Sequence, residues 1–185
     1  NGISRWLYND LHIYEKKITL EESATPLQIE ALRTDSGGQL IQESSLRFRA
    51  QGQEGYCGLT VLESGGMINF EDQRRQRIAL PREGAALSWK LAEGLGLVLG
   101  DEVEWNQIGR DAWHKVRITA INRTPFGQGL TMGREAFRDL GLEFKPTALL
   151  VPFGSEVLLE SPAIAGIKTK IQLIEALHSM LDSIR

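Results

Sequence analysis

The sequence predicts an α+β fold with mixed, mostly antiparallel sheets in two lobes and a long amphipathic helix at its C-terminal end. Three observations support this fold class. Short segments of strand-like alternation follow one another at hairpin spacing between residues 39 and 80. A compact unit of strand, helix and sharply folded chain occupies residues 84–105, and residues 168–184 carry apolar side chains at helical spacing.

The first unit is predicted to be strand, helix, strand. Apolar residues separated by charged ones indicate a strand over about residues 11–20. Thr25 and Pro26 form a favourable helix start, because the threonine hydroxyl can accept from backbone N–H groups and proline lacks the N–H that the first turn leaves unpaired. This helix continues to Arg33, and a long strand is expected over residues 39–50.

The next segments read as short strands joined by turns. Residues 56–62 and 67–70 predict a hairpin around Ser64-Gly65-Gly66, and residues 77–80 lead through a turn into the central unit. Strands at this spacing favour an antiparallel or mixed sheet.

The central unit begins with a short strand at residues 84–87. Ser88 is then expected to cap a helix over residues 89–95, and alternating apolar residues lie on either side of a tight turn at Gly100-Asp101. The chain is therefore expected to fold sharply back on itself.

The last part of the chain contains both strands and helices. Residues 115–120 alternate as a strand with one buried face, and a helix is predicted over about residues 133–140 with Thr131 as its cap. Residues 148–151 are continuously apolar, as in a buried strand. The final helix, 168–184, has one apolar half, on which Ile174, Leu177 and Leu181 are the expected central buried positions.

Composition excludes several kinds of function. The 185 residues have a formal net charge of −3, which gives no general attraction to nucleic acid. Cys57 is the only cysteine, so an intrachain disulfide, a zinc-cysteine cluster and a CxxC pair are all impossible. The longest apolar run, residues 148–153, is far shorter than the ~20 residues that span a bilayer.

Catalytic and cofactor sites are not predicted. His12, His114 and His178 lie far apart in sequence, and no serine occurs in a G-x-S-x-G pattern. The loop at Gly127-Gln128-Gly129 lacks the Lys-Ser/Thr of a phosphate-binding loop. We therefore expect no enzyme activity, no metal and no cofactor, and the isolated chain is expected not to bind nucleotides.

Four aromatic residues of the middle section allow two interpretations. Either they pack in the core of a small lobe, or they form an exposed recognition surface for a partner. These residues are Trp89, Trp105, Trp113 and Phe126.

One motif in the central unit resembles a known family. The pattern S-x-K-L-A-x-x-L-x-L-x-x-G-D resembles a segment of the extracytoplasmic domains of FtsX-like ABC transporter permeases. It is matched here by Ser88, Lys90, Leu91, Ala92, Leu95, Leu97, Gly100 and Asp101. Residues 5–17, 121–129 and 137–146 and the final I-x-x-L-H-S-M-L pattern are also similar to Gram-positive members of that family. The similarity is weaker over residues 21–79.

The resemblance implies a non-catalytic domain on the extracytoplasmic face of the cell membrane, divided in two parts like the periplasmic domains of MacB-type permeases. Lobe A is expected at about residues 1–79 and 142–185, and the inserted lobe B at about 80–141. The domain would couple ATP-driven movement of membrane helices to an external substrate or partner.

The implied complex contains a cytoplasmic ATPase subunit and a second permease copy or half, with an external lipid, peptide or protein partner and no nucleic acid. The final helix is then expected to continue into a membrane helix. The alternative is an independent soluble ligand-binding or sensory module.

Overall fold

The computed structural model describes residues 2–63, 66–124, 127–155 and 160–184. They form two compact units: unit 1 comprises residues 1–41, 65–69 and 146–185, and unit 2 comprises residues 42–64 and 70–145. Strands of mixed, mostly antiparallel pairing combine with helices, the last of them long and amphipathic, which confirms the predicted α+β class.

The division between the units differs from the predicted lobe boundaries. Residues 42–64, 70–79 and 142–145, which we expected in lobe A, belong to unit 2. The reason is strand pairing: β2 (Gln39–Ala50) pairs with β7 (Glu102–Gln107), and β3 (Gln53–Leu62) pairs with β9 (Gly129–Gly133). The alternation of a strand reveals its buried face but not its partner.

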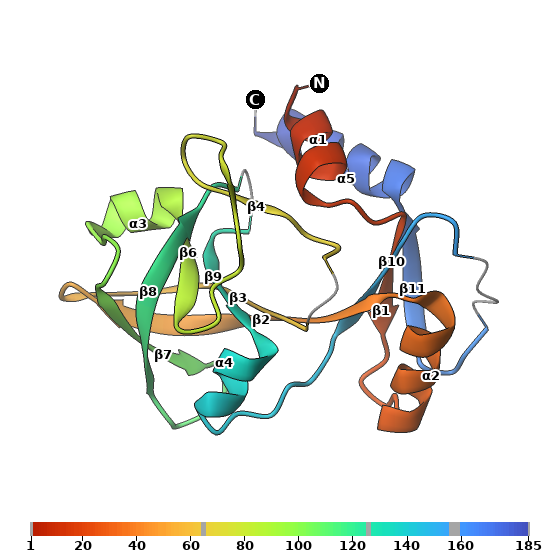
Figure 1. Cartoon of the computed structure of the whole chain (residues 1–185), viewed down its shortest axis with the longest axis horizontal. Coiled ribbons are helices and arrows are strands. Elements are labelled where there is room, and N and C mark those ends of the chain that lie inside the picture. The colour runs from red at the N-terminus through yellow and green to blue at the C-terminus, as the bar shows by residue number, and fades with distance from the viewer. Residues whose placement is uncertain (1, 64–65, 125–126, 156–159, 185) are drawn as a thin grey trace. The chain divides into compact units, whose positions relative to one another are not determined.

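Unit 1 contains an antiparallel sheet in the order β11 (Ile164–Thr169), β1 (Lys16–Leu20), β10 (Ala148–Val151), followed by the first residues of β2 (Figure 1). All four residues of β10 are buried, as its continuous apolar sequence predicts. The strand expected over residues 11–20 begins later, at Lys16, because a helical segment extends through Leu11 and residues 12–15 belong to no named helix or strand.

That segment consists of α1 (Gly2–Arg5) and the π-helical η1 (Trp6–Leu11). Its apolar residues Trp6, Leu7 and Leu11 are buried. The backbone N–H of His12 donates to the Leu7 carbonyl at 2.7 Å, which spans five residues as in a π-helix. The wider turn brings residues 6 and 11 to the same buried side.

The two longer helices of unit 1 begin with reciprocal caps. In α2 (Pro26–Ser36) the hydroxyl of Thr25 accepts from the Gln28 N–H at 3.2 Å, and the Gln28 side chain accepts from the Thr25 N–H at 3.0 Å. Thr169 and Gln172 repeat this arrangement in α5 (Lys170–Ser183). Because both reciprocal bonds form, two of the N–H groups that a helix start leaves unpaired are satisfied at each start.

Unit 2 is organised around a closed barrel. Its strands follow in the order β2, β3, β9, β6 (Ala85–Ser88), β8 (His114–Asn122), β7, and β7 pairs back onto β2. The β3–β9 and β6–β8 pairs are parallel, and β6–β9, β7–β8 and β2–β7 are antiparallel. Closure leaves no open sheet edge among these six strands.

Three shorter elements complete unit 2. The helices α3 (Trp89–Leu95) and α4 (Arg134–Asp139) pack against the barrel strands. The strands β4 (Phe70–Glu71) and β5 (Arg77–Ile78) pair in a small hairpin. The core is formed by buried apolar side chains from both helices and from all six barrel strands, including Leu46, Val61, Leu87, Ala92, Trp105, Ile118, Met132 and Phe137.

Two predicted caps are wrong. Ser88 precedes α3, but its hydroxyl does not bind the helix; it accepts from the Gly129 N–H at 2.8 Å, between β6 and β9. Thr131 lies within β9, and Gly133 is the residue that precedes α4. In both places the strand pairing of the barrel determines the position of the polar side chain.

Candidate functional site

The segments at the two ends of the chain meet in unit 1. Helices α1 and α5 lie side by side (Figure 1). Ser4 is buried in this contact, and its Oγ lies 3.4 Å from Nε2 of His178. His178 of α5 therefore contacts α1 through Ser4.

Helix α5 is attached to unit 1 through a narrow apolar strip. Leu177 is only 3% exposed, whereas the flanking Ile174 and Leu181 are half-buried. Two residues of the predicted apolar half are largely exposed: Ile171 by 69% and Ile184 by 72%. Leu177 is therefore the centre of the attachment, and the coupling role assigned to these positions stays a prediction.

The start of α5 is joined directly to the sheet. Thr169 is the last residue of β11, where it pairs with Lys16 of β1, and it is also the cap residue of α5. The Lys170 N–H, the first of the helix, donates to the Glu15 carbonyl at 2.8 Å. No loop separates the strand from the helix.

His12 follows η1 in a cluster of aromatic rings. Its Nδ1 lies 2.9 Å from the Tyr14 hydroxyl, and its ring meets those of Tyr8 and Tyr14 edge to face. Burial lowers the pKa of His12 to about 4 from the usual 6.5, and the positive charge of Lys17 contributes further. His12 is therefore neutral in the folded protein at neutral pH.

We expect unit 1 to lose stability as the pH falls from 7 to 5. In this interval the unfolded chain binds a proton at His12 that the folded chain does not bind, so acidification favours unfolding. The loss attributable to His12 is on the order of 1–2 kcal/mol. Urea unfolding at both pH values measures it. His12→Gln should lose less on acidification than the unaltered chain, and equal losses in the two proteins would contradict the assignment.

The four aromatic residues do not form one surface. Trp105 is fully buried in the barrel, so of the two interpretations the core one applies to this residue. Trp89 and Trp113 are half-buried, and Phe126 lies outside the described residues. Trp113 immediately precedes β8, and Arg123, whose guanidinium lies over the Trp89 ring, immediately follows β8. The nine residues of this strand separate Trp113 from Arg123 by about 30 Å along the chain.

Trp113 belongs to a separate charged cluster. The guanidinium carbon of Arg49 lies 3.7 Å from the centroid of the Trp113 ring, within cation–π distance. Glu54 binds both Arg47 and Arg49 at 3.0 Å, and these contacts hold the pKa of its carboxyl below the usual value. The ring is half-buried and the charges are paired, while the side chains of Arg47, Arg49 and Glu54 stay 40%, 44% and 51% exposed.

Reactive groups are scarce in the described residues. Burial raises the pKa of the Cys57 thiol to about 11, so it remains protonated and weakly nucleophilic at neutral pH. No group of three or more His, Cys, Asp or Glu side chains within the described ranges could hold a metal ion. Over those same residues, no helix has the length and apolar character needed to cross a bilayer.

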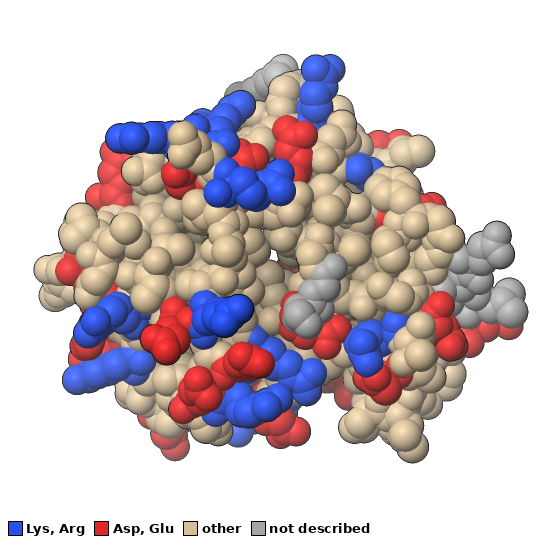
Figure 2. All heavy atoms as spheres, in the orientation of Figure 1, with Lys and Arg blue, Asp and Glu red and all other residues tan. Residues whose placement is uncertain are grey.

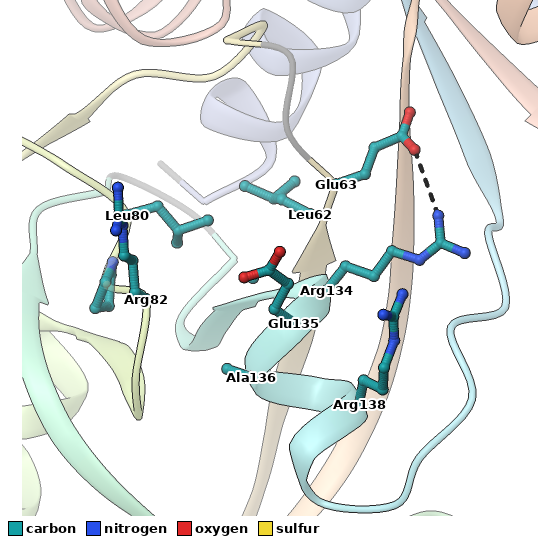
Figure 3. A pocket seen from close by; sticks show the side chains of 10 residues that line it. Leu62, Glu63, Leu80, Arg82, Arg134, Glu135, Ala136 and Arg138 are labelled. Carbon is teal, nitrogen blue, oxygen red and sulfur yellow. Dashed lines mark ion pairs between the residues drawn. The ribbon is translucent and has the colours of Figure 1, made fainter.

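The described part of unit 2 contains an arginine-lined cavity of about 610 Å³. It is bounded by the end of β3, the segment 80–82 and the start of α4 (Figure 3). Such a volume is within the usual range of ligand pockets. The sequence pattern does not predict this site: Arg134 and Arg138 have the i, i+4 spacing of one helix face, but the other walls come from distant segments.

The surface charge is mixed elsewhere. Lys and Arg side chains alternate with Asp and Glu side chains over the visible face (Figure 2). This pattern agrees with the small net charge and gives no long-range steering toward a strongly charged partner. Charge recognition at the cavity would therefore be local.

Comparisons with known proteins identify the fold. No protein-family model matches the sequence, and no curated protein sequence matches it. The periplasmic region of MacB from Actinobacillus actinomycetemcomitans is similar in structure, with a TM-score of 0.61 and 9% sequence identity over 96% of this chain and 98% of that one.

A second solved structure agrees. The extracellular domain of the noncanonic ABC-type transporter YknZ from Gram-positive bacteria has a TM-score of 0.54 and 15% identity, over 89% of this chain and 94% of that domain. The chain therefore has the fold of these extracytoplasmic transporter domains.

Proposed function

We propose that the chain is a non-catalytic extracytoplasmic domain of a bacterial ABC transporter permease. The observation that carries this proposal is that the structural match to the MacB periplasmic region extends over nearly the whole of both chains. Neither chain has a large part without a counterpart in the other. In this role the domain lies at the cell membrane, and the full complex contains a cytoplasmic ATPase subunit and a second permease copy or half. An external lipid, peptide or protein is its partner or substrate.

The contact between α1 and α5 supports a mechanical role. Two helical segments from opposite ends of the chain lie together, and one of them passes directly into a sheet strand at Thr169. In a permease, membrane helices that continue from these segments would move them together. The rigid α5, attached through Leu177, would then transfer that movement to the sheet of unit 1.

A flexible joint tests this proposal. We expect a Gly-Ser segment inserted after Arg185 in the full-length permease to leave the domain folded but to lower transport-coupled ATPase or export activity, because a random coil cannot transmit a tilt. A helix-forming Glu-Ala-Ala-Ala-Lys insert of equal length is the matched control and should retain more activity. Unchanged coupling with the flexible insert would contradict the lever role and leave the domain as a passive docking surface.

A further inference from the structure

One side of the arginine-lined cavity carries a guanidinium group that neighbouring side chains hold in place. Arg134 lies 3.7 Å from the Glu63 carboxylate, and its guanidinium is 4.7 Å from the Phe144 ring centroid. These contacts fix Arg134 while its side chain stays 43% exposed, so donors remain free for a ligand. Arg138, one helical turn later on α4, makes no ion pair with another described residue and lies on the same side of the cavity (Figure 3).

The middle of the cavity carries the opposite charge. The carboxylate of Glu135 rises between Leu80 and Arg134, and Arg82 stands on the far side (Figure 3). Glu135, like Arg138, forms no ion pair within the described residues. The cavity therefore presents, between basic walls, a carboxylate that forms no ion pair with a described residue.

Apolar side chains complete the lining. Leu62 and Ala136 are buried beneath the charged groups, and Leu80 and Pro81 form part of the opposite wall. Ligand sites in proteins combine such an apolar surface with a few polar groups that fix orientation.

The charge arrangement selects a class of ligand. A purely anionic molecule would meet the Glu135 carboxylate, and a purely cationic one would meet three guanidinium groups. We propose that the cavity binds a short zwitterionic peptide, with its carboxylate on Arg134 and Arg138, its ammonium group on Glu135 and its side chains on Leu62 and Leu80. A guanidinium pair suits a carboxylate because each planar fork donates two parallel hydrogen bonds.

Blocked peptides test the proposal on the isolated 185-residue chain. The probes are the tripeptide Ala-Leu-Leu, its N-acetyl form and its C-terminal amide, titrated by calorimetry and by amide chemical-shift mapping. We expect saturable binding of the free tripeptide with amide shifts at residues 133–138 and at Leu80 and Arg82. Loss of either end charge should weaken binding by about tenfold to a hundredfold, the range of a charged hydrogen bond.

Matched variants locate the site. Arg138→Gln and Glu135→Gln should each weaken binding by at least about tenfold, and Lys115→Gln, on the exposed side of β8, should leave it unchanged. Thermal unfolding of each variant separates a loss of binding from a loss of folding. Absence of saturable binding, equal affinity for free and acetylated peptide, or unchanged binding by both variants would overturn the proposal. Because the assay needs no transporter, its result is independent of the permease assignment.

Discussion

Replacing Trp105 by alanine is expected to lower the free energy of unfolding by about 3–5 kcal/mol. The side chain has 0% exposure, and its ring is stacked with Phe137 at a centroid separation of 6.4 Å and packs against His114 at 4.9 Å. Its removal leaves a cavity in the centre of the barrel, where surrounding strands cannot collapse because the sheet is closed. Its Nε1 has no hydrogen-bond partner among the described residues, so removal of this buried donor relieves a desolvation penalty and places the expected cost toward the lower end of that range.

Urea unfolding followed by circular dichroism measures this change. Trp113→Ala is the matched control, because that ring is half-buried beside Arg49 and should cost much less. If the two tryptophan variants were equally stable, Trp105 would not be a core residue.

Replacing Leu177 by alanine is expected to destabilise the protein by about 2–5 kcal/mol. Leu177 is the one buried residue among the described positions of α5, so the helix has no second deep contact to compensate for its loss. Chemical denaturation provides the measurement. Ile171→Ala changes a residue of similar size on the same helix that is 69% exposed, and it should alter stability by no more than about 0.5 kcal/mol. Comparable losses at both positions would mean that the helix is attached through a broader face.

Local chemistry made some elements predictable. The Thr25 cap and the buried strand β10 depend on neighbouring residues or a continuous apolar run, and the structure contains both of them. Trp105 was also accessible to prediction: with Val103 it alternates against Glu102 and Glu104, which places both apolar side chains on the inner face of β7. Trp113 lies outside any strand, so periodicity gives no information about it.

The remaining features could not be predicted from the sequence, because they depend on pairing between strands that lie far apart along the chain. Strand β11 was not predicted, because its residues Ala165 and Gly166 carry no alternating pattern and its support comes from β1. Closure of the barrel depends on the β2–β7 register, which joins residues 46–49 to residues 104–107. The cavity follows from the same closure, since its walls at residues 62–63, 80–82 and 133–138 come together only in the folded unit.

The direct passage from β11 into α5 has a consequence for mechanical strength. The chain enters β1 near Lys16 and leaves β11 at Thr169, so both helices depart from the same end of one antiparallel strand pair. A force that separates the helices breaks the ladder one hydrogen bond at a time, beginning with Lys170 to Glu15. A force that pulls both helices together along the strands instead loads several bonds of the sheet in shear. Unit 1 should therefore yield readily when its two helices are pulled apart and resist when they move in concert.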